Sequence, residues 1–571
     1  MKEFLALWNR LVGTTYDAVN TNRAVPEHRK ARECFQEYPV EPSCSGARKY
    51  RTSIIIAILG ISGMLLGTAI QVVNPYDMIF RWKLIFEKGG EIYELWRAPP
   101  VELYLKVYLW NVTNKDEYMS GRHDKLKVEE VGPYVYRELL THENVTFNEN
   151  GTLTAVPKHP LIWVPELSNG RREDDLVILP NIALLSIADV VSDQSYFTRL
   201  GLNLLIRQTE SLPLVQMTAR EFMFGYSSTL MTLGNKFLPN WITFEKLGLI
   251  DRMYDFDGDY ETVYNGQKLG LENIGLIEKY RGSTKIPQWD SPCGDISGSS
   301  DGTKFAGYIQ PNDTLMFFRK SMCRAKKLVK VNETIANGLK AYVYHFDPEA
   351  DDNGHTNERN RCFCKPDRPC LPPGLLDVRG CYYGFPIALS YPHFLDGGRQ
   401  LSAKVEGTRP ERRKHMSYFV IQPDSGLPIE LAVRYQINMA LGDIATIANC
   451  ERFDNMILPL LWTEIKLDKL PDSLGVRFRL YLNILPMLEK YCVYGLLIGG
   501  LLFLLASTYK FNQVRRKSAK KYPWSEGDLM FNVDRKLSNY IPSGGDRLPK
   551  EMRAYLDNVV VPLTRGCREG A

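Results

Sequence analysis

The sequence predicts an α+β membrane protein in which two transmembrane helices flank one large, strand-rich domain. Two apolar stretches without a charged residue run from Ser53 to Val73 and from Tyr491 to Tyr509. The segment between them, 74–490, mixes polar and apolar residues and alternates like β-strands over much of its length. One block inside it, Leu184–Leu233, has few Gly or Pro residues and the three- and four-residue apolar spacing of helices. The chain is therefore expected to be a membrane hairpin that carries a single domain.

Each apolar stretch is long enough to cross the roughly 30 Å hydrocarbon core of a bilayer as a helix. Basic residues lie beside both stretches, and an excess of Lys and Arg marks the cytoplasmic side. They are Arg48, Lys49 and Arg51 before the first stretch and Lys510, Arg515, Arg516, Lys517, Lys520 and Lys521 after the second. Both tails, 1–52 and 510–571, are therefore expected in the cytoplasm, and 74–490 outside the cell or in a lumen. Because the N-terminal tail is too polar for a cleaved signal peptide, the first span is expected to be a signal anchor.

Outside the helical block, β-branched and aromatic residues alternate with polar ones, which is typical of half-buried strands. The clearest strands are Val101–Trp110, Val128–Arg137 and Lys340–Phe346. Shorter strands are predicted at Tyr260–Tyr264, Leu315–Arg319, Tyr418–Gln422 and Leu431–Met439. Turn residues separate most of these segments, so we expect an antiparallel β core with a helical insertion.

Cysteines gather in one window of the domain, 293–381. They are Cys293, Cys323, Cys362, Cys364, Cys370 and Cys381. An even, clustered set in an oxidising compartment is typical of three disulfides, although six cysteines allow 15 pairings. The alternative is a zinc site on the last four, but their one- and five-residue gaps fit poorly with the spacing of zinc ligand pairs. A further cysteine, Cys450, is expected to be a buried free thiol.

Glycosylation motifs and overall charge fit this topology. The N-glycosylation sequons begin at Asn111, Asn144, Asn150, Asn312 and Asn332, all in the middle segment. The 71 basic and 66 acidic residues nearly balance, which gives no ground for a nucleic-acid partner. The basic clusters are accounted for by the membrane topology.

Motifs that would indicate catalysis or metal binding are weak. Gly298–Gly302 has the Gly-x-Ser-x-Gly spelling of a nucleophile elbow, but its Ser- and Gly-rich surroundings favour a loop. Asp255–Asp259 resembles a calcium loop whose glycine comes too early, and a hairpin turn is the better interpretation. None of the 8 histidines belongs to a metal-ligand pair in the sequence. We therefore expect no enzyme, no catalytic or metal-binding residues and no cofactor.

Small residues in the spans and one cysteine beside them suggest membrane contacts. Gly63 with Gly67, and Gly495 with Gly499, have the spacing that lets helices approach closely in lipid, within one chain or between chains of a homo-oligomer. Glycine is also simply common in membrane helices. Cys44 is a candidate for palmitoylation, with a free cytosolic thiol as the alternative.

Several local motifs, in a fixed order, resemble those of one family. They are GPYVYR at Gly132–Arg137, REFMFGY at Arg220–Tyr226, CFC at Cys362–Cys364, PHFL at Pro392–Leu395 and PLLW at Pro459–Trp462. With the hairpin topology and the sequons, the chain resembles the class B scavenger receptors, which include a fatty-acid translocase, a high-density-lipoprotein receptor, a lysosomal membrane protein and insect relatives. The resemblance covers the domain and both spans.

The resemblance implies a fold and a disulfide pairing. The pairs would be Cys293 with Cys362, Cys323 with Cys381, and Cys364 with Cys370. The fold would be an antiparallel β-barrel with a three-helix bundle at the membrane-distal apex, which the block Leu184–Leu233 would supply. A hydrophobic tunnel would run through the barrel toward the bilayer.

The resemblance also implies a function. The chain would bind lipids such as fatty acids, sterols, carotenoids or phospholipids, or lipoprotein-like carriers, and mediate their uptake or transfer at the plasma membrane. Two alternatives are a trafficking receptor for a luminal protein in endosomes or lysosomes and a two-span ligand-gated channel. The family motifs do not fit the channel.

The helical block contains a candidate ligand-binding segment. Its apolar residues are Leu200, Leu202, Leu204, Leu205 and Ile206, and Arg207 follows. At the 100° rotation of a helix these apolar residues surround the axis, so part of the cluster should be exposed or dock on neighbouring helices. An exposed apolar patch usually marks a binding site, and an arginine can meet an anionic headgroup. The alternative is that the leucines pack inside the bundle while Arg207 is solvated.

Overall fold

The computed structural model describes residues 45–228, 246–268, 270–365 and 369–521. The chain divides into two units, 1–62 with 500–571 and 63–499, which are described separately. The ends of both predicted cytoplasmic tails, including Cys44, lie outside the described residues, as does the end of the predicted helical block.

The first unit contains parts of two long helices, α2 (Ser45–Val73) and α13 (Leu485–Lys521). Both helices are long and apolar enough to cross a bilayer. Within this unit Ser53 Oγ donates a hydrogen bond to the carbonyl of Ser507, and Ser507 Oγ donates one to the carbonyl of Ser53, both at 2.8 Å. A Cβ at Gly60 would lie 2.9 Å from the carbonyl oxygen of Gly500, so only glycine allows this approach.

The remaining turns of α2 and α13 belong to the second unit. Gly67 is buried there, and a Cβ on it would lie 3.2 Å from side-chain atoms of Leu496 and Leu497. Gly63 is half-buried, whereas nothing lies within 4 Å of the Cβ position at Gly495 or Gly499. Within one chain the close approach therefore uses Gly67, and packing by Gly495 and Gly499 between chains stays a prediction.

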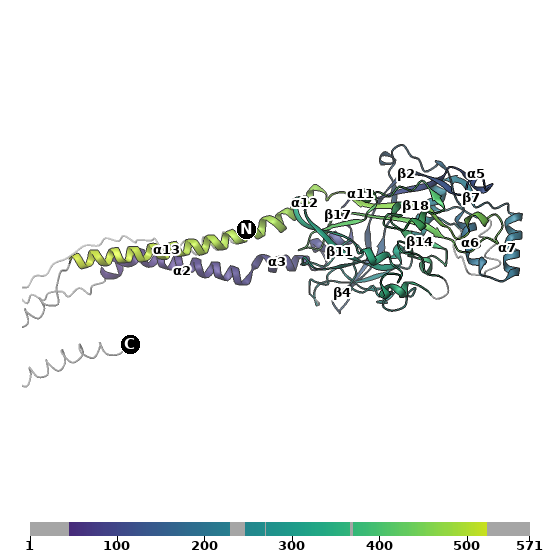
Figure 1. The fold of residues 1–571 in the computed structure, drawn as a ribbon. Coiled ribbons are helices and arrows are strands. Elements are labelled where there is room, and N and C mark those ends of the chain that lie inside the picture. Colours follow the sequence, from purple (N-terminus) through teal and green to yellow (C-terminus); the bar gives the residue numbers. More distant parts are fainter. Residues whose placement is uncertain (1–44, 229–245, 269, 366–368, 522–571) are drawn as a thin grey trace, which may run out of the picture. The chain divides into compact units, whose positions relative to one another are not determined.

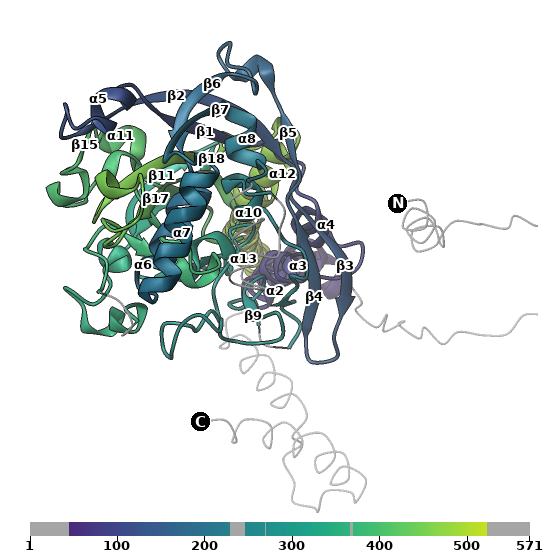
Figure 2. The same ribbon diagram turned by 90° about the vertical axis from the view of Figure 1, so that its right-hand side faces the viewer.

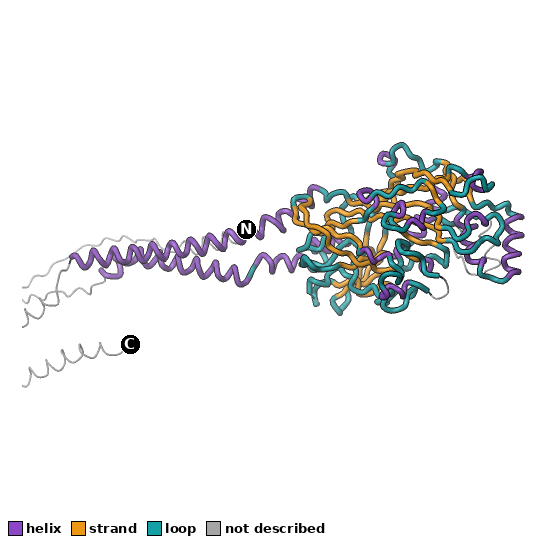
Figure 3. Tube along the Cα trace, viewed as in Figure 1, coloured by secondary structure: helices purple, strands orange, loops and turns teal. Residues whose placement is uncertain are grey.

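A large sheet forms the core of the second unit. Figure 1 shows the helices at the ends of this unit, and Figure 3 shows its strands in orange. It has 12 strands, nine of them in the order β10-β11-β12-β16-β17-β18-β1-β2-β15. Their bounds are β1 (Leu103–Val112), β2 (Leu126–Glu138), β10 (Leu315–Arg319), β11 (Arg324–Ala336), β12 (Leu339–Phe346), β15 (Val405–Glu406), β16 (Tyr418–Ile421), β17 (Pro428–Ala440) and β18 (Ile457–Leu467). The side strands are β5 (Leu161–Trp163), β13 (Leu376–Asp377) and β14 (Ile387–Ser390). Every predicted strand of this sheet is present, within a few residues at its ends.

The sheet is antiparallel except where β15 pairs parallel to β2. In its middle, β1 pairs with β18 so that Tyr108 lies opposite Trp462, and their rings stack at 3.9 Å. Strands β17 and β18 are buried over most of their length, because side chains cover both faces of the sheet. This explains why their sequences are apolar runs and not strict alternations.

The family resemblance implied a closed barrel, but the sheet is open. Its strand path ends at β10 on one side and at β15 on the other, and these two strands do not pair. A loop covers the outer edge of β10. Ser300 N donates to the carbonyl of Met316, and Phe318 N donates to the carbonyl of Ser300, both at 2.8 Å. At the other edge β15 has only two residues. Irregular backbone thus satisfies edge groups that a closed barrel would pair between strands.

Two smaller sheets flank the core. One has the order β3-β4-β8-β9, with bounds β3 (Thr141–Phe147), β4 (Thr152–Lys158), β8 (Glu261–Tyr264) and β9 (Ile277–Tyr280). The other pairs β6 (Leu176–Pro180) with β7 (Leu214–Thr218). Strand β7 lies inside the block predicted to be helical, so that prediction is wrong at this point. Backbone pairing with β6, a tertiary interaction, overrides the local pattern.

Helices cover the ends of the domain. Those of the predicted block are α6 (Ile182–Ser192), α7 (Tyr196–Gln208) and α8 (Ala219–Phe224). The others are α3 (Pro75–Leu84), α4 (Glu91–Arg97), α5 (Lys115–Met119), α10 (Leu249–Met253), α11 (Arg412–His415) and α12 (Asp472–Arg479). Figure 2 shows α6 and α7 side by side across one end of the domain. Asn181 and Ser195 cap these two helices, accepting hydrogen bonds from the backbone N–H groups of Leu184 and Thr198.

Three disulfides join Cys293 to Cys362, Cys323 to Cys381, and Cys364 to Cys370. This is the pairing that the family resemblance implied. Cys450 is a buried free thiol, as predicted, and burial raises its pKa to about 12. The thiol therefore stays protonated at physiological pH.

The two motifs dismissed in the sequence have structural roles. Ser300 of Gly298–Gly302 is buried in the loop that covers β10, and its hydroxyl donates to the carbonyl of Lys304 at 2.6 Å. In Asp255–Asp259, Asp259 pairs with Arg281 at 2.5 Å and with Lys320 at 2.6 Å. Neither segment has the geometry of the site that its spelling suggests.

Candidate functional site

An apolar cavity of about 90 Å³ lies between α12, the start of β1, the start of β17 and the end of β18. Its lining contains no charged side chain. The residues are Leu95, Pro99, Pro100, Val101, Leu103, Leu140, Gly302, Thr303, Leu427, Pro428, Leu431, Leu467, Leu470, Leu474 and Phe478. Such a lining provides no partner for a polar ligand atom except the Thr303 hydroxyl and backbone groups, so it suits a hydrocarbon group.

One wall of the cavity is helix α12, which leads directly into α13. Leu474 and Phe478 stand four residues apart, so they share one face of the helix, and both are buried. Val476 on another face is 57% exposed. The chain continues from α12 through one π-helical turn, Leu480–Ile484, into the candidate membrane span. The cavity therefore lies at the end of the domain where the C-terminal span begins.

Exposed apolar side chains surround this end of the domain. On α3, Trp82 is 65% exposed, and Met78 and Ile79 are also exposed, although Phe80 and Leu84 of the same helix are buried. After α12, Ile484 is exposed as well. Tryptophan beside a span is typical of the membrane–water interface, and large apolar side chains are stable there without a protein partner. This distribution is typical of a surface that lies beside a membrane.

Helix α7 carries the predicted ligand-binding segment at the opposite end of the domain (Figure 1). The structure splits the segment. Leu202, Leu205 and Ile206 are buried, whereas Leu204 is 60% exposed and Arg207 is exposed. Arg207 makes no ion pair with a described residue. The structure thus buries part of the cluster and exposes the rest, and ligand binding by the exposed residues stays a prediction.

Asn203 fixes helix α7 to the loop between β17 and β18. Asn203 Nδ2 donates to the carbonyl of Thr446 at 3.0 Å, and Ala448 N donates to Asn203 Oδ1 at 2.8 Å. The aromatic residues Tyr196 and Phe197 at the start of the helix are 65% and 80% exposed. The exposed residues of α7 thus present apolar groups and the guanidinium of Arg207 on a rigid support.

A larger open depression of about 600 Å³ has a different lining. Acidic and basic groups dominate it, among them Asp251, Asp255, Asp257 and Lys158. Its lining residues His159 and Tyr254, together with Arg319, surround the buried Glu138. Burial opposes ionisation, but these groups lower the pKa of Glu138 to about 2. This polar lining does not suit a hydrocarbon chain.

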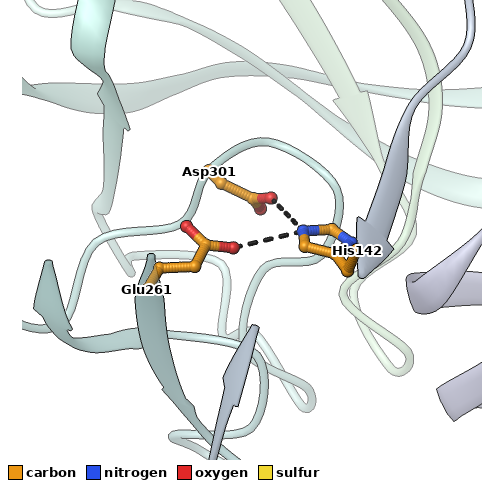
Figure 4. Close-up of side chains that lie close together, drawn as sticks. All are labelled: His142, Glu261 and Asp301. Atoms are coloured by element: carbon orange, nitrogen blue, oxygen red, sulfur yellow. Dashed lines mark ion pairs between the residues drawn. The ribbon is translucent and has the colours of Figure 1, made fainter. Parts of the chain in front are cut away.

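Three residues far apart in the sequence meet in the interior of the domain (Figure 4). They are His142 on β3, Glu261 on β8 and Asp301 in the loop that covers β10. His142 Nε2 lies 3.1 Å from Glu261 Oε1 and 3.4 Å from Asp301 Oδ2. Burial acts against protonation, but the two carboxylates raise the pKa of His142 to about 9. Among the described residues these are the only three that group as a metal ion would require.

The predicted modification sites lie mostly on the surface. Asn144, Asn150, Asn312 and Asn332 are exposed. Asn111 is half-buried in β1, and its Oδ1 accepts a hydrogen bond from Ile178 N at 3.0 Å. Glycosylation at all five sequons stays a prediction.

Sequence reasoning missed the cavity and the His142 cluster. Leu470, Leu474 and Phe478 follow one another at four-residue spacing, a signal of one buried helical face that could have been noticed. Nothing in the sequence connects His142, Glu261 and Asp301, because only the fold brings their three segments together.

Comparison with known proteins identifies the family. Residues 52–511 match the CD36 family. Scavenger receptor class B member 1 of Cricetulus griseus is 30% identical over 527 residues, 91% of this chain and 98% of that protein. The mouse protein of the same name is 31% identical over 418 residues, 72% of this chain and 79% of its own. Lysosome membrane protein 2 of Rattus norvegicus is 28% identical over 415 residues, 72% of this chain and 84% of that protein. These matches confirm the resemblance found in the motifs, and the chain belongs to the CD36 family.

Proposed function

We propose that this protein is a scavenger-receptor-like membrane protein that binds lipids, or particles that carry them, and mediates their uptake or transfer. The observation that carries the proposal is the apolar cavity beside the start of the C-terminal span. A few methylene groups of a lipid chain in this cavity would be shielded from water close to the bilayer. Membership of the CD36 family and the similarity to scavenger receptors support the same function.

The topology proposed for this function has both tails in the cytoplasm and the domain outside the cell or in a lumen. The basic residues beside each span support this orientation. Disulfides in the domain support it too, because they form in oxidising compartments. Addition of a glycan to a sequon engineered after Lys521 would contradict it.

The ligand would first meet α7 and then reach the cavity through the interior of the domain. The exposed Leu204 suits an apolar group, and Arg207 suits a carboxylate or phosphate. A continuous path from α7 to the cavity is part of this proposal. Candidate ligands are fatty acids, sterols, carotenoids and phospholipids, alone or in lipoprotein-like carriers.

The test replaces a cavity residue and compares it with a neighbour on the same helix. Leu474→Trp should fill the cavity from α12, whereas Val476→Trp adds the same ring on an exposed face of that helix. Both full-length variants are brought to equal surface amounts, and uptake of fluorescent fatty acid and sterol ester is measured. Uptake should fall severalfold in Leu474→Trp alone. Equal uptake by both variants and the parent would exclude the cavity from the path.

A second candidate function is transport of a luminal protein to endosomes or lysosomes. The similarity to Lysosome membrane protein 2 favours it. A tagged full-length chain would then reside in endosomes at steady state, and the Leu474→Trp variant would keep that distribution. Residence at the cell surface together with loss of lipid uptake in this variant supports the first function.

A further inference from the structure

The His142 cluster is built so that one imidazole nitrogen faces two carboxylates. His142 Nδ1 lies 2.9 Å from the backbone carbonyl oxygen of Trp96. A carbonyl oxygen only accepts, so Nδ1 must carry the hydrogen. The indole ring of Trp96 stacks on the imidazole at 3.9 Å between centroids and 14° between planes, which fixes the ring. Nε2 is therefore the nitrogen that is free to bind a proton or a metal ion.

The two carboxylates are also held from outside the cluster. Asp301 Oδ1 accepts hydrogen bonds from Thr303 N at 2.9 Å and from Thr303 Oγ1 at 2.6 Å, which turns Oδ2 toward His142. The Glu261 side chain is only 5% exposed, and its Oε1 has no contact with solvent. This oxygen lies 3.1 Å from His142 Nε2 but accepts no hydrogen bond of acceptable geometry. Unless Nε2 carries a proton, this buried carboxylate oxygen faces a nitrogen lone pair, so the cluster requires either a proton or a cation between the two atoms.

The charge balance of the His142 cluster also calls for a cation. With a neutral His142, the cluster would hold two buried carboxylates and no positive charge of its own. Lys320 and Arg281 are paired with Asp259, and Arg319 is paired with Glu138. A proton on Nε2 would neutralise one carboxylate, whereas a divalent cation would neutralise both.

The spacing of the three atoms suits a cation. All three lie within 4.8 Å of one another. At metal–ligand distances of about 2.1 Å, tetrahedral ligands stand about 3.4 Å apart, close to the separations of Nε2 from the two oxygens. Imidazole with carboxylates is a ligand set for zinc and similar transition metals, whereas calcium and magnesium prefer oxygen alone. The carbonyl of Trp96 and the Thr303 groups would act as the outer hydrogen bonds that orient metal ligands.

We propose that His142, Glu261 and Asp301 form a binding site for a divalent transition-metal cation, with Zn²⁺ as its expected occupant. Asp301, with its side chain 20% exposed, gives the ion a route from solvent. The site joins β3, β8 and the loop that covers β10, and through Trp96 it also holds α4. A bound cation braces these segments against one another. This proposal is independent of the proposed lipid function.

The first experiment measures metal binding by the full-length protein in detergent after removal of metals with a chelator. One equivalent of Zn²⁺ should remain bound after dialysis, and it should raise the melting temperature by several degrees, because it binds only the folded state. Co²⁺ alone should give the visible absorption of a cobalt ion with nitrogen and oxygen ligands, and Zn²⁺ should remove it. Ca²⁺ and Mg²⁺ should have no effect. Absence of both the cobalt absorption and the zinc-dependent stabilisation in the parent protein overturns the proposal.

Variants assign the binding to this cluster. Glu261→Gln keeps the shape of the side chain and removes a charged ligand, and His142→Gln removes the nitrogen. Both should lose the bound zinc and its stabilisation. The control is His123→Gln, because His123 is exposed and could hold zinc adventitiously. If Glu261→Gln and the parent bind zinc equally, the metal lies elsewhere and the cluster is a protonated histidine between two carboxylates.

Discussion

The cavity beside α12 and the outer face of α7 would both contact lipid, yet they hold their apolar residues in opposite ways. Leu474 in the cavity wall is 6% exposed and belongs to the packed interior. Leu204 on α7 is 60% exposed and contributes little to that interior. The cavity must therefore combine binding with stability, whereas the α7 surface is free to serve binding alone. Substitutions should separate these two cases.

The largest expected effect comes from a charge in the cavity wall. Leu474→Asp buries a carboxylate among apolar side chains and should cost about 3 kcal/mol or more of unfolding free energy. Leu204→Asp places the same group in water and should change that free energy by less than about 0.5 kcal/mol. Thermal unfolding of the purified full-length variants and their amounts at the cell surface measure the difference. Equal losses in both variants would remove the distinction between the two regions.

A smaller and more selective effect is expected at Arg207. Arg207→Glu reverses the charge that faces solvent on α7 and should slow the capture of anionic lipids severalfold, more at low than at high salt. Stability and uptake of neutral sterol ester should stay unchanged. Arg413→Glu, an exposed arginine on α11, makes the same change in net charge away from α7. If both variants slow capture equally, the effect belongs to the overall charge and not to α7.

The contrast between regions also shows what the sequence could predict. Alternation and apolar spacing follow from local neighbours, so β1, β2, β10, β12, β16 and β17 of the main sheet were predicted near their observed positions, and the predicted helical block contains most of α6 and all of α7. Strands β11 and β18 of the same sheet were not predicted. Strand β7 was missed because its extended form depends on β6, and the open edge of the sheet depends on a loop at Ser300. The cavity has a lining from several separate segments, and the His142 cluster has one residue from each of three. Such sites depend on tertiary contacts that no local pattern contains.

The disulfides illustrate a third situation. Counting cysteines predicted three bonds but left their partners open, because the spacing permits many pairings. The pairing came from the resemblance of short motifs to a known family, and the structure has the same pairs. For the glycines of the spans, no such resemblance helped. Their spacing alone did not show which of them make close contacts within one chain, and in the structure these are Gly60 and Gly67.

The smallest expected effect concerns pH, to which neither of the two proposed lipid-binding regions should respond directly. The cavity has no titratable lining, and arginine stays charged. A response at acidic pH should come from two stacked histidines, His393 and His415, whose rings lie 4.1 Å apart. His393 Nε2 lies 2.8 Å from Glu130 Oε2, and its Nδ1 accepts from Arg409 N at 2.9 Å. His415 Nδ1 likewise accepts a hydrogen bond, from the backbone N–H of Glu411 at 3.0 Å.

Burial, with repulsion from His393, lowers the pKa of His415 to about 4, while the carboxylates of Glu130 and Glu411 oppose this shift and Lys414 adds to it. Protonation would also break the hydrogen bond that His415 Nδ1 accepts. Between the unfolded pKa of about 6.5 and the folded value, the unfolded chain binds a proton that the folded chain does not. Stability is therefore complete above pH 6.5 and falls as the pH drops toward 4. His415→Phe keeps an aromatic ring on Trp462 and should reduce this loss, which thermal unfolding of the full-length protein at pH 7.5 and pH 5 measures. An identical loss in the parent and the variant would assign the pH response to other groups. The difference in burial between Leu474 in the cavity wall and Leu204 on α7 would not be affected by that result.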